Sequence, residues 1–137
     1  MDIIQKKCKP ISKEELQGMR ETIKEESRWK IISRVVIDFY NEVIKFSKTN
    51  DNTTFNFSVK NRQFFQVGEC CKFLDNNKED IINTLEDIFV GCDIQINTFS
   101  KAGNGKMCDI SKMDEDTLSL FDSKYNESRI VINWGKC

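Results

Sequence analysis

The chain contains 137 residues, 39% of them hydrophobic and 31% charged, and its formal net charge is −1. This length favours a single domain, residues 1–137, with its own hydrophobic core. The balanced charge excludes a strong overall field toward nucleic acid or an anionic membrane. No apolar run approaches the roughly 18 residues of a membrane-spanning helix, so we expect no membrane partner. The first residues lack the apolar core of a signal peptide, and we therefore expect a protein that is not secreted.

A helical pattern covers residues 13–48. The capping-box pair Ser12 and Glu15 predicts where it begins, because the serine hydroxyl can accept a hydrogen bond from the Glu15 amide. Its first part is polar, with a thin apolar stripe formed by Leu16, Met19 and Ile23. Its second part carries core-type residues at helical spacing: Ile32, Val35, Val36, Phe39, Tyr40, Val43 and Ile44. The pattern leaves open whether this region is one helix or two, and residues 1–28 are a candidate N-terminal helical arm.

A strand and a short helix are predicted next. Residues 53–59 alternate Phe55, Phe57 and Val59 with polar neighbours, which is typical of a strand with one buried face. The pattern between residues 60 and 78 is weaker, and a short helix across 69–75 fits it best.

The stretch 79–97 organises the rest of the chain. Its first half places apolar residues on one helical face: Ile81, Ile82, Leu85, Ile88 and Phe89. Gly91 predicts a tight stop after this helix. Ile94 and Ile96 then alternate with polar residues, so we expect a half-buried strand over 92–99.

The remaining residues form a long excursion and a closing strand. Residues 100–106 predict a flexible loop, 114–122 a short helix or turn, and 129–134 a strand that pairs antiparallel with 92–99. The resulting order of helices and strands is an α+β layout. We expect a small, mostly antiparallel sheet of three or more strands with helices packed on one face.

The residues that carry chemistry argue against an enzyme and against a cofactor or metal site. The chain has six cysteines but no histidine, which excludes zinc sites built from both and leaves a cysteine nucleophile without its usual base. We expect reduced, mostly structural thiols, and a redox or enzymatic role for Cys70 or Cys71 is the third hypothesis. Residues 103–106 lack the spacing of a phosphate loop. The acidic run 114–116 lacks calcium-loop spacing and is better explained as a solvated turn.

Two kinds of partner remain. The leading hypothesis is a non-enzymatic interaction protein that binds a protein partner, or a second copy of itself, through the N-terminal helix. The residues expected to bind that partner are Leu16, Met19, Ile23 and Trp29. The alternative is a nucleic-acid-binding accessory protein that uses the basic residues Lys24, Arg28, Lys30, Arg34 and Lys45. Glutamates interleaved among these basic residues favour a solvated helix face instead.

Three segments carry a resemblance: 36–57, 81–96 and 129–135, which are a helix leading to an aromatic strand, a helix leading to a strand, and an Ile/Val strand ending near Trp134. Together they resemble a recurring type of small α+β protein of nucleocytoplasmic large DNA viruses. The Asn-, Lys- and Ile-rich composition also looks like the product of an AT-rich viral genome. The resemblance implies a viral structural or interaction protein, a minor virion component, located in the virion or the host cytoplasm. It brings no catalytic residues to this chain.

Overall fold

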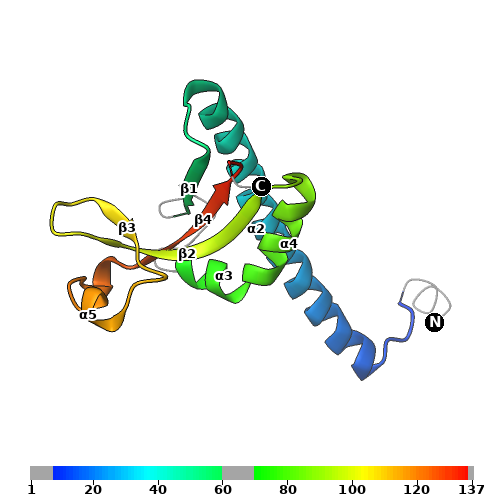
Figure 1. The fold of residues 1–137 in the computed structure, drawn as a ribbon. Helices are drawn as coiled ribbons and strands as arrows, with labels where there is room; N and C mark the ends of the chain where they lie inside the picture. The colour runs from blue at the N-terminus through cyan, green and yellow to red at the C-terminus, as the bar shows by residue number, and fades with distance from the viewer. Residues whose placement is uncertain (1–7, 60–69, 136–137) are drawn as a thin grey trace. The chain divides into compact units, whose positions relative to one another are not determined.

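The computed structural model describes residues 8–59 and 70–135 (Figure 1). Its elements are α2 (Lys13–Thr49), β1 (Thr54–Ser58), α3 (Cys70–Asn76), α4 (Lys78–Ile88), β2 (Asp93–Lys101), β3 (Met107–Asp109), α5 (Glu115–Leu118), the 3-10 turn η1 (Ser123–Tyr125) and β4 (Glu127–Asn133). The chain separates into two compact units, one ending at Ser33 and the other beginning at Arg34.

The first unit contains the N-terminal part of α2. Ser12 Oγ accepts a hydrogen bond from the Glu15 amide at 3.1 Å, which confirms the predicted start of the helix. The pattern had left one helix or two as alternatives for residues 13–48, and the structure has a single helix, Lys13–Thr49.

The second unit is built on a curled antiparallel sheet with the strand order β1-β4-β2-β3. β4 therefore lies between β1 and β2, pairing Ile130 with both Phe57 and Ile96. This register confirms the predicted antiparallel pairing of the strands near residues 92–99 and 129–134. The α+β prediction, with a mostly antiparallel sheet, is also confirmed.

One face of the sheet carries the hydrophobic core. The alternate residues Ile94, Ile96, Ile130 and Ile132 are buried there, as the two-residue period of a strand requires. Helices α3 and α4 pack against β4 and β2 (Figure 1). The part of α2 that follows Arg34 contributes Phe39, whose ring makes edge contacts with Phe57 and Phe89, at 5.5 and 5.7 Å between centroids. Phe55 lies tilted against the same ring at 6.5 Å.

Two residues predicted to face the core are exposed. Tyr40 keeps its ring against that of Phe89, with centroids 5.7 Å apart, while much of the side chain remains in solvent. Such an arrangement suits a ring with a polar hydroxyl. Ile88 is the last residue of α4, so no later turn of that helix extends its apolar face past it.

Gly91 makes the predicted stop after α4. The amide of Phe89 still bonds to the Leu85 carbonyl at 2.8 Å, and the amide of Cys92 bonds to the Phe89 carbonyl at 3.3 Å. Between them, Gly91 has φ +80°, a left-handed conformation that glycine adopts without steric cost. The chain can therefore reverse from α4 directly into β2.

The segment after β2 is more ordered than the sequence predicts. Residues 100–106 were expected to form a flexible loop, but β2 continues to Lys101 and a turn with Gly105 at φ +84° leads into β3. The expected short helix is α5, capped by the side chain of Asp114. The buried hydroxyl of Ser100 donates to the carbonyl of Asp122 at 3.4 Å, which connects β2 to the residue just before η1.

Candidate interaction surfaces

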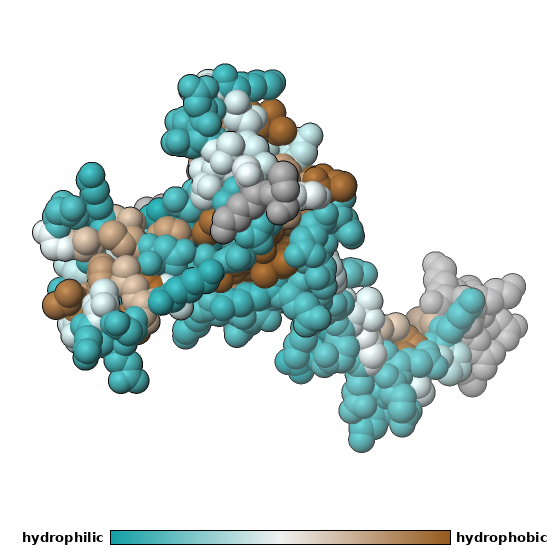
Figure 2. Space-filling model, viewed as in Figure 1, coloured by the Kyte–Doolittle hydropathy of each residue, from teal (hydrophilic) through white to brown (hydrophobic). Residues whose placement is uncertain are grey.

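The predicted partner-binding residues lie on one side of the first unit. Leu16, Met19 and Ile23 are 54%, 49% and 63% exposed, which is unusual for large aliphatic side chains on a single helical stripe. At about 100° per residue, these three occupy an arc of roughly 60° around the helix axis. Trp29, 38% exposed, lies roughly 80° beyond Met19 by the same geometry. We call Leu16, Met19 and Ile23 the aliphatic stripe, and Figure 2 shows apolar groups exposed among hydrophilic ones toward this end of the chain.

Trp29 is held by its own helix. Its indole Nε1 donates to Glu25 Oε1 at 3.0 Å, and the guanidinium of Arg28 lies 5.1 Å from the centre of its rings. Arg28 also pairs with Glu25 at 2.6 Å, and this hydrogen bond holds the pKa of Glu25 below its ordinary value of 4.5. The indole is therefore held in place with its N–H already used, and it lies about 9 Å farther along the helix than Ile23 rather than beside the aliphatic stripe.

The basic residues of the alternative hypothesis do not form one free basic surface. Lys24 pairs with Glu21 at 3.9 Å and Arg28 with Glu25, each across three helical positions. These pairs cancel much of the local positive charge that a phosphate backbone would require. Of the remaining basic residues, Lys30 belongs to the first unit, whereas Arg34 and Lys45 belong to the second.

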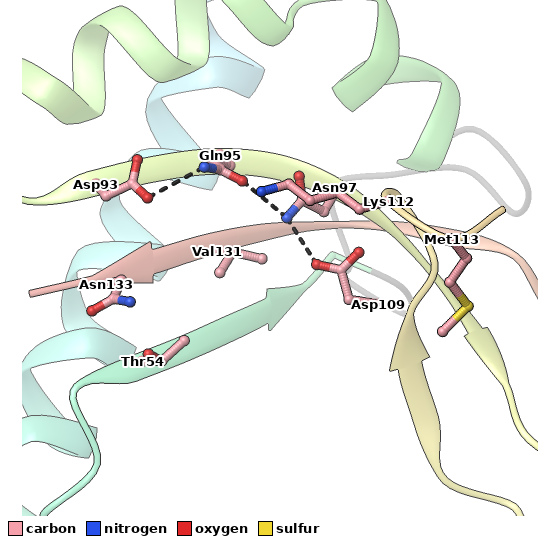
Figure 3. A pocket seen from close by; sticks show the side chains of 9 residues that line it. All are labelled: Thr54, Asp93, Gln95, Asn97, Asp109, Lys112, Met113, Val131 and Asn133. Carbon is pink, nitrogen blue, oxygen red and sulfur yellow. Dashed lines mark hydrogen bonds between the residues drawn. The ribbon is translucent and has the colours of Figure 1, made fainter. Parts of the chain in front are cut away.

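The second unit has a hollow on the face of its sheet opposite the core. Figure 3 shows the side chains that line it, and its volume is about 360 Å³. They come from all four strands or the loop after β3: Thr54, Asp93, Gln95, Asn97, Asp109, Lys112, Met113, Val131 and Asn133. Sequence reasoning had not singled out this surface. Its only sequence signal is that the polar residues alternating with Ile94 and Ile96 must share a face.

The polar groups of this hollow largely satisfy one another. Asn97 Nδ2 donates to Gln95 Oε1 at 3.2 Å and to Asp109 Oδ2 at 2.9 Å, while Gln95 Nε2 donates to Asp93 Oδ2 at 3.2 Å (Figure 3). Asp109 Oδ1 also accepts from the amide of Ser111 at 2.9 Å. Such a ladder fixes side chains across β2 and the segment after it, and it leaves few amide donors for a ligand.

The cysteine hypothesis concerns Cys70 and Cys71, which lie at the start of α3. Cys8 is exposed and Cys92 and Cys108 are half-buried, and all three carry free thiols. Nothing is described of the side chains of Cys70 and Cys71. Among residues 8–59 and 70–135, no cluster of three or more potential metal-ligating side chains occurs.

Comparison with known proteins adds no relative. No protein-family model matches the chain, and neither a curated protein nor a solved structure shows significant similarity to it. Within the described part of the chain, no helix has the length and apolar character needed to cross a membrane.

Proposed function

We propose that this chain is a non-enzymatic interaction protein and that its aliphatic stripe binds a protein partner. The main support for this proposal is that Leu16, Met19 and Ile23, on one arc of the helix, are each 49–63% exposed. Removing apolar surface from water contributes about 25 cal/mol per Å², so burial of three such side chains supplies a driving force for association. Trp29, exposed farther along the same helix, belongs to a residue type enriched where partners bind most strongly.

The viral assignment is a separate part of this proposal. It rests on the resemblance of three segments to small proteins of nucleocytoplasmic large DNA viruses and on the Asn-, Lys- and Ile-rich composition. On this view the protein is a minor structural component of the virus particle. Detection of the chain in purified particles supports it, and its presence only in host cytoplasm removes the virion role.

A site-specific photo-crosslinker tests the binding surface in the cells that produce the protein. We place it at Met19, within the aliphatic stripe, and in a matched variant at Glu21. Two helical positions lie about 200° apart, so Glu21 faces away from the stripe. We expect a covalent adduct with another protein chain from position 19 and little from position 21.

The outcome is read from the mass and peptides of the adduct. Equal or absent crosslinking at the two positions contradicts the proposed function, because a partner bound to the stripe must contact residue 19.

Nucleic-acid binding is the weaker proposal, because Lys24 and Arg28 are already paired with Glu21 and Glu25. Salt-dependent retention on DNA, lost in a Lys30→Gln variant, would favour it instead.

A further inference from the structure

The aliphatic stripe has the spacing of a coiled-coil seam. Leu16, Met19 and Ile23 follow one another at steps of three and four residues, which are consecutive a, d and a positions of a heptad. Glu26 and Lys30 occupy the next d and a positions, so the apolar repeat ends after Ile23. A partner helix therefore meets a short apolar seam bounded by charge.

The two residues that flank the seam carry opposite charges. In the same heptad, Glu15 is a g position and Arg20 is the following e position, the two places that face each other across a parallel pair of helices. Four other charges on this part of α2 are paired within the helix, Lys24 with Glu21 and Arg28 with Glu25. Within residues 8–59 and 70–135, the side chains of Glu15 and Arg20 have no ion-pair partner.

From this charge complementarity we infer that the occupant of the aliphatic stripe is a second copy of this chain. The two helices run parallel, with Glu15 of each copy facing Arg20 of the other. This inference rests on the proposed function, since it names the partner of the same surface. The interface is a weak one, because three apolar residues per helix bury far less than the roughly 1,200 Å² of a stable complex.

Charge reversal tests the register in the full chain. Light scattering should show a mass that rises with concentration from 16.0 kDa toward twice that value. Glu15→Arg alone places two arginines opposite each other and should weaken self-association at least threefold, as should Arg20→Glu. The variant with both changes restores the attraction and should recover most of the loss. Glu14→Arg is the control, because it alters the charge of the same helical turn on the opposite side.

A disulfide tests the orientation. In a Cys8→Ser background, Leu16→Cys puts a thiol at an a position, and parallel helices bring the two copies of that thiol together. Mild oxidation should give a covalent dimer, and Glu14→Cys should not. In antiparallel helices an a position packs against a d position, so position 16 faces position 19 or 26 and the two copies of residue 16 lie about 4.5 Å or more apart along the axis, outside a shared layer.

The results separate this inference from the proposed function. A monomer at every concentration, or equal association of the single and double charge variants, overturns the parallel self-pairing. If the Met19 crosslinker then captures a different protein, the proposed function stands and only the second copy is excluded. If it captures nothing, both fail.

Discussion

Glu127 and Arg129 form a charged pair on the face of the sheet opposite the core, where the Glu127 side chain is only 8% exposed. Arg129 Nε lies 2.8 Å from Glu127 Oε1, and Ser58 Oγ donates to the other carboxylate oxygen at 3.1 Å. Arg129 Nη1 reaches Asn56 Oδ1 at 2.7 Å, and the guanidinium lies 5.2 Å from the centre of the Phe99 ring. The pair therefore connects the central strand β4 to both of its neighbours.

Replacing only one residue of this pair should lower the unfolding free energy more than replacing both. Arg129→Leu leaves a buried carboxylate without its guanidinium, and we expect a loss of about 3 kcal/mol in unfolding free energy. Replacing both residues, Glu127→Leu with Arg129→Leu, should lose less, because no uncompensated charge remains. Urea denaturation measures the difference. A double variant that is as unstable as the single one contradicts the view of Glu127 as a carboxylate dependent on Arg129.

Gly135 should resist substitution because of Thr53. A Cβ at position 135 would clash with Thr53 Oγ1, and the neighbouring Trp134 amide donates to the Thr53 carbonyl at 2.9 Å, so the two segments cannot easily separate. We expect Gly135→Ala to lower the free energy of unfolding by about 1–3 kcal/mol, because the added methyl group overpacks this site. Adding Thr53→Ala removes the nearest atom and should recover part of the loss. Gly103→Ala, with open space around the new Cβ, is the control.

Gly91 should be sensitive for a different reason. A Cβ there meets no atom within 4 Å, but the backbone φ of +80° is unfavourable for other residues. Gly91→Ala should therefore cost about 1–2 kcal/mol, while Gly91→Asn should cost less because asparagine tolerates this conformation better. Gly18→Ala, in the second turn of α2 with open space around it, should instead stabilise the helix by about 0.5–1 kcal/mol. Circular dichroism melts compare the three, and equal effects at positions 18 and 91 would refute the conformational argument.

Asp114 predicts an acid-sensitive helix cap. Its carboxylate accepts from the Thr117 amide at 2.8 Å, and hydrogen bonding with Thr117 holds the pKa of Asp114 below its ordinary value of 3.8. Folding therefore favours the ionised form of Asp114. The stability that this carboxylate contributes is present above its pKa in the unfolded chain and is lost as the pH falls through its pKa in the folded protein. Asp114→Asn keeps a capping acceptor without that titration. The stability gap between the wild type and Asp114→Asn should shrink below about pH 4 in pH-dependent melts.

Periodicity was enough to predict the main elements of this fold. The alternation of Ile94 and Ile96 and the helical spacing around Phe39 are long, regular signals, and both led to the correct element and the correct buried face. β3 was missed because three residues, Met107–Asp109, are too few to establish a period. Its pairing with β2 depends on the turn at Gly105, whose left-handed backbone becomes evident only in the structure.

The polar surfaces were harder to predict because each is assembled from distant segments. Asn97 and Asp109 meet only after β2 and β3 have formed a hairpin, and neither residue is notable in its own stretch of sequence. The aliphatic stripe was predictable because its residues are close in sequence. What binds it remains a proposal, since spacing alone does not identify a partner.

The position of β4 also determines when the sheet can form. Of the four described strands, β4 is the last to leave the ribosome, yet it is the strand that β1 and β2 both require as a neighbour. Asn56 and Arg129, joined across β1 and β4, are 73 positions apart. Helices α2 and α4 can form locally during synthesis, but the edges of β1 and β2 that hydrogen-bond to β4 stay unpaired until those late residues emerge. Completing the sheet therefore requires contacts between residues far apart in the sequence, and the strand edges that β4 covers remain exposed until it emerges.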